Sequence, residues 1–315
     1  MEKHIEELVS KLTEKYQHTG QDVASYLEGL LVSDYVPYWE YIHLDTLMTL
    51  QKPKTKYPDE RIFIMYHQVT ELFFRLILDE CEQVVANIRS AEQAAEFEMR
   101  LKRINRYFKI LTDSFSVMGE GMEQQQFLKF RMALLPASGF QSAHYRTIEL
   151  YATEFRHLVH KDHRSKYNDE HAIEEMYPFI YWKTGATELG SGKKTYTLQQ
   201  FEEKYDGVLL EKAKELRGKT IGAVFNAFFS NHEAIVKQMK NFDLNVNVNW
   251  PLAHYKTAVK YLQRHPETIA ATGGTNWQKY LPPRFQVRIF YPMLWTDMEK
   301  EEWGKAWVEE ARAEL

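Results

Sequence analysis

The stretch that decides the fold runs from Pro58 to Ile88 and reads PDERIFIMYHQVTELFFRLILDECEQVVANI. It begins with a proline and two acidic residues, which are favoured in the first turn of a helix because the amides there are free and the helix dipole attracts negative charge. Apolar residues then recur at the helical period, and the expected stripe consists of Ile62, Met65, Val69, Leu72, Phe73 and Leu76. The segment therefore predicts one long amphipathic helix.

The same period dominates the rest of the chain. Further helices are expected over residues 4–16, 38–50, 93–118, 123–134, 140–156, 198–216, 219–241, 249–263 and 296–313. Only Leu244 to Val248 alternates as a strand does, and residues 161–198 show no period, which predicts an irregular insertion on the surface. The pattern predicts an all-α protein, with a single large domain of about ten helices over residues 43–315 and an N-terminal helical arm over residues 1–42.

Composition narrows the class of protein. A chain of 315 residues can bury roughly 75% of its unfolded surface, and 44% hydrophobic with 27% charged residues excludes disorder over most of it. The net charge of −4 leaves no basic surface for nucleic acid or an anionic membrane. The single cysteine, Cys81, excludes an internal disulfide framework and a cysteine-based zinc site. No signal peptide or membrane span is apparent, so we expect a cytoplasmic protein.

Aromatic and histidine residues are abundant, with 18 Phe, 19 Tyr, 7 Trp and 12 His. They suit either an aromatic-lined cavity or a well-filled core. Most histidine patterns favour structural roles: the His-x-Asp pairs at His43 and His160 are expected on helix surfaces or caps, because that iron-ligand spacing belongs on strands. His157 and His163 drift around a helix and are expected to be solvated. A di-iron bundle needs two Glu-x-x-His motifs and two further helical glutamates, so the motif at Glu154 does not by itself predict one.

Three residues and one loop can be interpreted either as structural or as functional. His67 faces apolar and aromatic residues at helical spacing, so it is either a core histidine or a group directed at a ligand. Arg131 lies in a very apolar segment, where an arginine is rarely buried without an anion or an internal salt bridge. His254 lies one turn into a helix begun by Trp250 and Pro251, and residues 271–276 form a polar loop that is either a plain turn or a cover for a polar substrate group.

Taken together, several strings of residues resemble the tryptophan 2,3-dioxygenase family, whose members are haem enzymes of all-helical fold. The match is close over about residues 35–150 and partial over 245–280. The segments that carry it are Tyr38–Asp45, Phe63–Leu72, Phe127–Ser142 with its extension Tyr145–Glu149, and His254 with Thr272–Gly274. The strings His-Gln-x-x-Glu-Leu and Ser-Gly-Phe-Gln-Ser are specific in this combination and order.

The resemblance implies a role for each matching position. His254 would be the protein ligand of the haem iron, and His67 would accept a hydrogen bond from the indole nitrogen. Arg131 would bind the carboxylate of the amino acid, and Thr272 its ammonium and carboxylate end. Phe63 and Phe127 would form the walls of the indole pocket, Ser138 would lie near the haem, and Phe115 would take the place of a haem-pocket tryptophan.

Members of the family form homotetramers built as a dimer of dimers, so the resemblance also implies a neighbouring subunit. Tyr38, Tyr41 and Ile42 would reach that neighbour's active site. The loop at Ala271–Asn276 departs from the family's Gly-Thr-Gly-Gly-Ser-Ser, and the segment before it is a few residues longer.

The implied function is a haem b dioxygenase that cleaves the indole C2–C3 bond of L-tryptophan with O₂ and gives N-formylkynurenine, the first step of tryptophan catabolism along the kynurenine pathway. One haem is expected per subunit, ferrous in the active state. Two alternatives remain at this point: a haem monooxygenase that hydroxylates a tryptophan- or tyrosine-like amino acid, and a non-catalytic haem-binding protein.

Overall fold

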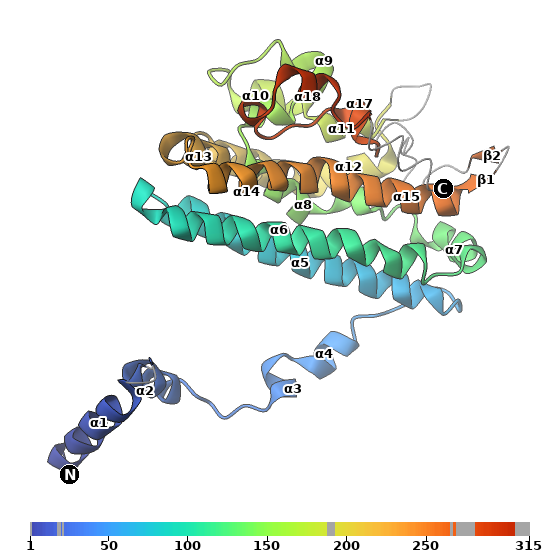
Figure 1. The fold of residues 1–315 in the computed structure, drawn as a ribbon. Helices are drawn as coiled ribbons and strands as arrows, with labels where there is room; N and C mark the ends of the chain where they lie inside the picture. The colour runs from blue at the N-terminus through green and yellow to red at the C-terminus, as the bar shows by residue number, and fades with distance from the viewer. Residues whose placement is uncertain are drawn as a thin grey trace. The chain divides into compact units, whose positions relative to one another are not determined.

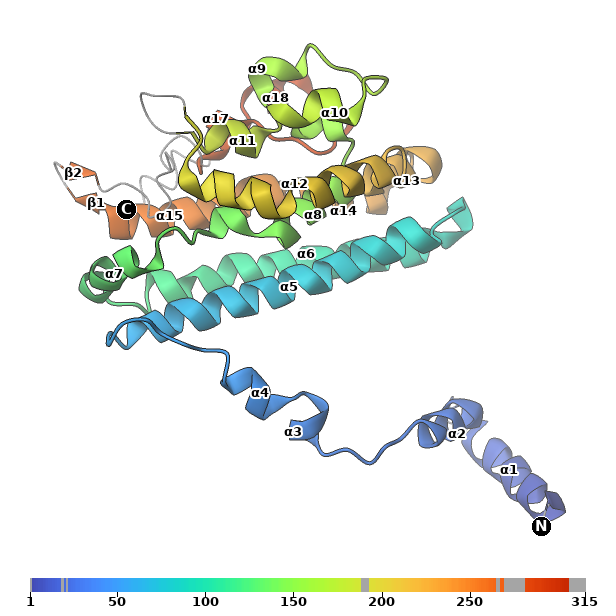
Figure 2. The same ribbon diagram turned by 180° about the vertical axis from the view of Figure 1, so that it is seen from behind.

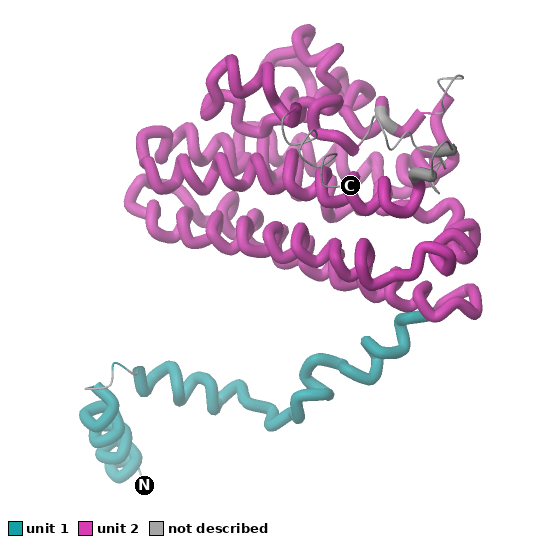
Figure 3. The backbone as a smooth tube through the Cα atoms, turned by 45° about the vertical axis from the view of Figure 1, so that its right-hand side comes forward, with its two compact units in different colours: residues 1–52 teal, residues 53–315 magenta. Residues whose placement is uncertain are grey.

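The computed structural model describes residues 2–17, 20, 22–187, 193–264, 267–268 and 281–305. The chain divides into two compact units, Met1–Lys52 and Pro53–Leu315 (Figure 3). The first unit thus extends ten residues beyond the expected arm of residues 1–42. The expectation that this arm contacts a neighbouring subunit stays a prediction.

The first unit consists of short helices with little buried surface. They are α1 (Glu2–Gln17), α2 (Val23–Leu31), α3 (Tyr38–Tyr41) and α4 (Leu44–Met48). Asp22 caps α2 by accepting hydrogen bonds from the amides of Ala24 and Ser25. Most large apolar side chains of the unit are exposed, among them Leu30, Leu31, Val32, Tyr35, Tyr38, Trp39 and Tyr41. A surface of this kind is typical of a segment that packs against a partner.

Two long helices, α5 (Asp59–Asn87) and α6 (Ala94–Gly119), lie side by side and form the base of the second unit (Figures 1 and 2). The long helix expected after Pro58 is therefore confirmed. Its expected stripe, however, is not the buried face: Met65, Val69, Leu72 and Leu76 are exposed. The buried face is carried by Tyr66, Thr70, Phe74, Ile77, Leu78, Cys81 and Val84. Because α5 is apolar on both faces, its period does not reveal which face is buried.

A second layer of helices packs on this pair (Figure 2). It contains α8 (Ala143–Ala152), α12 (Tyr196–Leu216), α13 (Ile221–Phe228), α14 (Glu233–Leu244) and α15 (Trp250–Leu262). Helices α14 and α15 contact α6, and α8 contacts α5. The short α7 (Gln124–Phe130) contacts both α5 and α15 and lies at one end of the layers. The predicted all-α fold is confirmed in the described residues.

A third group of short helices covers the second layer: α9 (Lys161–Arg164), α10 (Ile173–Met176), α11 (Tyr181–Gly185), α17 (Pro283–Gln286) and α18 (Asp297–Glu301). The expectation that residues 161–198 form a surface excursion is wrong for the middle of this segment. Ile180 and Trp182 are fully buried, and Met176, Tyr177 and Tyr181 are nearly so. The segment lacks a period because its helices are only four or five residues long, not because it avoids the core.

Short elements connect the helices. The 3₁₀ turns are η1 (Ala91–Gln93), η2 (Arg131–Leu134), η3 (Gly139–Gln141), η4 (Phe155–Leu158), η5 (Tyr177–Phe179) and η7 (Pro292–Leu294). Two-residue strands, β1 (Gln263–Arg264) and β2 (Glu267–Thr268), pair antiparallel. The strand expected over residues 244–248 is wrong: Asn245–Asn249 is a π-helical turn, η6, that joins α14 to α15. Alternation over five residues is too short to separate the two structures.

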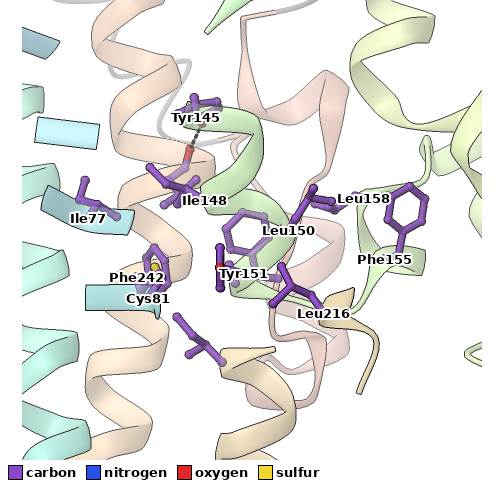
Figure 4. Close-up of a cluster of buried hydrophobic side chains, with 14 of the residues drawn as sticks. Ile77, Cys81, Tyr145, Ile148, Leu150, Tyr151, Phe155, Leu158, Leu216 and Phe242 are labelled. Carbon is purple, nitrogen blue, oxygen red and sulfur yellow. Dashed lines mark hydrogen bonds between the residues drawn. The ribbon is translucent and has the colours of Figure 1, made fainter. Parts of the chain in front are cut away.

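The core of the second unit lies where α5, α8 and α14 meet (Figure 4). Ile77 and Cys81 of α5 face Ile148 and Tyr151 of α8 and Phe242 of α14. Cys81 is completely buried, as expected for a small core residue, and burial holds the pKa of its thiol well above the ordinary value. No helix in the described part of the chain is long and apolar enough to cross a membrane.

Candidate functional site

A cavity of about 260 Å³ lies between the base helices and the second layer. Its walls come from α5, α6, α7, α8, α15 and the segments around Ser138 and Arg288. Six of the predicted site residues line it together: Phe63, His67, Phe115, Phe127, Ser138 and His254. These residues are up to 191 positions apart in the sequence, so the fold, not the local chain, assembles the site.

His67 is fixed on the α5 wall of the cavity. Its Nδ1 lies 2.7 Å from the carbonyl oxygen of Phe63, one turn earlier in the helix. A carbonyl oxygen only accepts, so this bond places the proton on Nδ1 and leaves Nε2 with a lone pair. Burial lowers the pKa of His67, while the hydrogen bond to Phe63 and the charge of Glu71 oppose that shift. The ring is thus a neutral hydrogen-bond acceptor.

His254 lies on the α15 wall of the same cavity. Its pKa is lowered to about 4, mainly by burial and to a smaller extent by the repulsion that a protonated His67 would exert. Phe115 of α6 stacks on the His254 ring, with centroids 5.6 Å apart and planes 24° from parallel. Within the described residues, no hydrogen bond reaches this ring. His254 therefore offers a neutral imidazole nitrogen that can bind a metal.

The π-helical turn η6 sets the direction of α15, because a wider turn changes which residues of the following helix face inward. The side-chain amide of Asn247 in this turn donates to the carboxylate of Asp243 at 2.7 Å, and Asp243 is completely buried. Asp243 also accepts from the amides of Phe290 and Tyr291 and from the indole of Trp295, at 2.9–3.1 Å. Burial nevertheless raises the pKa of Asp243. This network ties the base of the His254 helix to the segment that follows α17.

Aromatic side chains form the rest of the cavity wall around His67 and His254. Phe63 lies against His67 with ring centroids 4.1 Å apart, and Phe127 packs near Phe63 at 6.4 Å. Trp250 packs on Phe115 at 4.6 Å. Walls of this kind suit a flat aromatic ligand, which gains both buried area and favourable ring contacts.

The remaining predicted site residues lie elsewhere. Arg131 is buried at the start of η2, and burial lowers its pKa, but it is not part of the cavity wall. Tyr38, Tyr41 and Ile42 belong to the first unit, where they are exposed. Thr272 and the whole loop Ala271–Asn276 lie outside the described residues.

Sequence reasoning missed several polar residues of the wall. Arg146 and Arg288 both line the cavity although both are almost completely buried. Arg146 lies within the matching string Tyr145–Glu149, and an arginine in an apolar helix is the same signal that pointed to Arg131. Glu71 also lines the cavity, and its Oε2 lies 2.7 Å from Nδ1 of His144 on α8. Both of these side chains are half-exposed, so the pair lies at the rim.

Among the histidines expected to have structural roles, His157 departs from its expectation. His157 is buried, not solvated: its Nδ1 lies 3.1 Å from the carbonyl oxygen of Phe290 and 2.8 Å from the hydroxyl of Thr153. Burial and two nearby arginines, Arg156 and Arg164, lower its pKa to about 4. His160 caps α9 with its side chain, as expected, and His43 is exposed.

The donor set of the site fits a haem better than a bare metal ion. Across the described ranges, no three His, Cys, Asp or Glu side chains come together as ligands for an ion. A haem brings four nitrogen ligands of its own and needs only one from the protein. The neutral His254 on an aromatic cavity wall matches that need.

Comparison with known proteins relates the chain to one family of enzymes. A sequence model of the family described as tryptophan 2,3-dioxygenase matches residues 6–206. The chain is 35% identical over 294 residues to tryptophan 2,3-dioxygenase of Ruegeria sp. (strain TM1040), a match that covers 90% of this chain and 98% of that protein. Tryptophan 2,3-dioxygenase B of Danio rerio is 34% identical over 152 residues, 47% of this chain and 37% of the relative. Tryptophan 2,3-dioxygenase of Bacillus thuringiensis (strain Al Hakam) is 34% identical over 119 residues, 38% of this chain and 42% of the relative.

Proposed function

The chain belongs to the tryptophan 2,3-dioxygenase family, and from this premise we propose that it is a haem b enzyme that cleaves the C2–C3 bond of the L-tryptophan indole with O₂. Both oxygen atoms enter the product, N-formylkynurenine, so the reaction needs no other oxygen source. One observation carries the proposal: a single aromatic-lined cavity brings together His67 and His254 from opposite layers.

His254 would hold the iron through its free imidazole nitrogen, and Phe115 would keep the ring in place by stacking. When bound, the haem supplies the iron at which O₂ is activated. The lowered pKa of His254 supports this role, because a neutral imidazole is the form that binds a metal. The protein contributes the single ligand, the orientation of the substrate and the exclusion of water.

His67 would orient the indole. Its Nδ1 proton is committed to the carbonyl of Phe63, so its Nε2 accepts from the indole N–H. Phe63 and Phe127 would hold the faces of the indole ring. Because burial lowers the pKa of His67, the ring acts as a fixed acceptor that holds the indole N–H in place.

Arg131 and Thr272 would hold the amino-acid end of the substrate. A planar guanidinium binds a carboxylate through two parallel hydrogen bonds, which fixes both position and orientation. Arg131 is buried, and its backbone N–H donates to the carbonyl of cavity-lining Phe127, which supports this assignment by placing it beside the indole pocket.

We also propose the homotetramer, a dimer of dimers in which Tyr38, Tyr41 and Ile42 reach the active site of a neighbour. Exposed apolar surface supports it. Met65, Val69, Leu72 and Leu76 form a stripe along α5 at intervals of four, three and four residues, the spacing at which helices pack against one another. The cytoplasmic location of the protein stays a prediction.

The decisive experiment supplies the purified protein with L-tryptophan, a reductant and ¹⁸O₂. The product is expected to be N-formylkynurenine carrying two labelled oxygen atoms, by mass spectrometry. L-Tyrosine is expected to be a much poorer substrate, because its ring has no N–H to offer His67. A product with one labelled oxygen, or a preference for tyrosine, would establish a monooxygenase instead.

A further inference from the structure

The helix that carries His254 continues from an earlier helix without a loop. Helix α14, the π-helical turn η6 and helix α15 follow one another directly from Glu233 to Leu262. The amide of Trp250 donates to the carbonyl of Asn245, five residues earlier, which is the π-helical spacing. Such a turn holds more residues than an α-helical turn, so it rotates the residues that follow around the helix axis. The direction of His254 therefore depends on how η6 is held.

Pro251, directly after this turn, weakens the helix at the same place. In the π-helical pattern its position would supply the amide for the carbonyl of Val246, five residues earlier, but proline has no N–H. The hydroxyl of Tyr145 on α8 donates to that carbonyl instead, at 3.1 Å. A helix that lacks a backbone hydrogen bond at a kink takes its direction from the side chains around it. The groups that hold η6 thus set the course of α15.

The side chain of Asp243, in the last turn of α14, holds η6 in place. It is completely buried, and each of its carboxylate oxygens accepts two hydrogen bonds. Oδ1 accepts from the side-chain amide of Asn247 and the backbone amide of Phe290, at 2.7 and 2.9 Å. Oδ2 accepts from the backbone amide of Tyr291 and the indole of Trp295, at 3.1 and 2.9 Å. Because all of these partners donate, they favour the ionised carboxylate, to which hydrogen bonds are strongest.

Two contacts connect this carboxylate to the iron ligand that we propose. Asn247, which donates to Asp243, belongs to η6, is almost completely buried and lines the cavity. Trp250, the first residue after η6, packs on Phe115, and Phe115 stacks on the ring of His254. A shift of η6 would therefore reach His254 both along the helix and through this stack of rings.

We propose that Asp243 is a positioning residue for the iron ligand: its buried carboxylate fixes the kink at η6 and so directs the imidazole of His254 into the cavity. The inference rests on the proposed function, because it takes His254 as the ligand of a haem iron. Asp243 itself does not line the cavity, so it acts only through other residues. A metal ligand binds well only when its surroundings hold it in the productive orientation, so a loosened η6 would weaken the iron bond without removing the ligand.

The test compares two porphyrins that differ only in the iron. The full-length chain, purified without haem, is titrated with haem and with metal-free protoporphyrin IX, and binding is followed by quenching of tryptophan fluorescence. The ratio of the two affinities measures the contribution of the bond between iron and imidazole. We call it the iron ratio.

Asp243→Asn keeps the shape of the side chain, but its amide nitrogen cannot accept the two hydrogen bonds of the oxygen that it replaces. The variant is expected to lower the iron ratio about 10-fold or more, the range for groups that orient a metal ligand. The band of the iron–histidine stretch in the resonance Raman spectrum of the ferrous protein should shift or broaden. A wild-type iron ratio in a folded Asp243→Asn protein would overturn the proposal.

Glu80→Gln is the matched control. Glu80 is also a buried carboxylate, and it accepts from Arg100 and Arg103 of α6 without lining the cavity. Its substitution also removes a buried charge, so it is expected to lower the stability of the fold but to keep the wild-type iron ratio. An equal fall of the ratio in Glu80→Gln and Asp243→Asn would show that lost stability alone is responsible, and it would overturn the positioning role.

A double-variant cycle tests the route through His254. In His254→Ala the bond to iron is already lost, so adding Asp243→Asn should not lower the iron ratio further. A second fall of similar size would overturn the proposal. If Asp243→Asn does not fold, Asn247→Ala replaces it in every comparison, because it removes the contact between the carboxylate and η6, and the same outcomes apply.

The failure of the proposed function would look different. A protein that binds haem through His254 and shows the expected fall of the iron ratio, but forms no N-formylkynurenine, would refute the dioxygenase and leave the positioning role standing. An active dioxygenase whose iron ratio is the same in Asp243→Asn and the wild type would refute the positioning role alone.

Discussion

The imidazole of His67 donates its Nδ1–H to the carbonyl oxygen of Phe63, 2.7 Å away and one turn earlier in α5. This bond fixes which nitrogen carries the proton. It leaves Nε2 as an acceptor within a cavity that also holds His254. A rotated or doubly protonated ring would present a donor instead, and it could not accept a bond from an indole N–H.

The first prediction concerns this acceptor. His67→Ala is expected to lower kcat/KM for L-tryptophan about 5- to 150-fold, the effect of leaving one buried donor without its partner. 1-Methyl-tryptophan has no indole N–H, so the same substitution should change its binding little. Steady-state kinetics with the first compound and a binding titration with the second separate the two effects. Equal losses for both would mean that His67 acts by shaping the cavity.

The second prediction distinguishes the two histidines. His254→Ala is expected to purify with little or no haem, because the only proposed bond from protein to iron is lost. His67→Ala serves as the matched control and should keep its haem, since it removes a cavity histidine of similar burial. The absorbance ratio of haem to protein measures both. Full haem content with a histidine-ligated spectrum in His254→Ala would disprove the assignment of the ligand.

The sequence predicted the elements of the fold better than their orientation. The 29 residues of α5 follow a clear helical period, so the helix itself is found. Its buried face is not, because apolar residues occupy both faces and the exposed stripe reads like a core stripe. The choice between the faces depends on how α5 packs against α6 and α8, and the period of α5 alone carries no information about that packing.

Site residues that lie in a recognisable local string could be predicted from the sequence. Site residues that are linked only by contacts between distant segments could not. Phe63, His67 and His254 lie in recognisable strings and meet in one cavity. The buried hydrogen-bond network around Glu149, in contrast, joins Arg146 to Arg288 through Glu149 and Tyr181, and no local pattern links positions so far apart. The π-helical turn before α15 was likewise invisible, because five residues of alternating polarity fit a strand equally well.

A third prediction concerns Arg131. Arg131→Leu is expected to fold and keep its haem but to weaken L-tryptophan binding by about 30-fold to several thousand-fold, the cost of removing one partner of a buried charge pair. Tryptamine binding should change little, because it has no carboxylate. Calorimetric titration of both ligands measures the difference. If the affinities for both ligands fall equally, Arg131 has a structural role and does not bind the carboxylate.

A fourth prediction concerns the N-terminal arm. Tyr41→Ala is expected to be inactive because the proposed role of this ring is to close a neighbour's pocket, which suits an exposed tyrosine with a polar tip. Co-expressing Tyr41→Ala with the inactive His254→Ala should restore part of the activity, since some subunits would combine an intact arm with an intact haem site. Deletion of residues 1–42 should abolish activity altogether. A stable and fully active monomer would contradict the arrangement.

The last prediction is a pH dependence of stability that arises from His157. Burial lowers the pKa of this histidine from 6.5 to about 4. Between these values the unfolded chain binds a proton that the folded chain does not, so stability falls as the pH drops from 6.5 towards 4. The full loss amounts to about 3 kcal/mol, because each unit of pKa shift corresponds to roughly 1.4 kcal/mol.

His157→Asn removes the titrating group and keeps an N–H that can donate to the carbonyl of Phe290, as Nδ1 of the histidine does. Urea unfolding at pH 7 and at pH 4.5 should therefore show a loss of stability on acidification that is about 2–3 kcal/mol smaller in the variant than in the wild type. Carboxylates and the cavity histidines contribute equally to both proteins and cancel in this comparison. His43→Asn, which changes an exposed histidine of the first unit, is the control and should leave the loss as it is in the wild type. An equal loss in the wild type and His157→Asn would show that His157 titrates alike in the folded and unfolded chains.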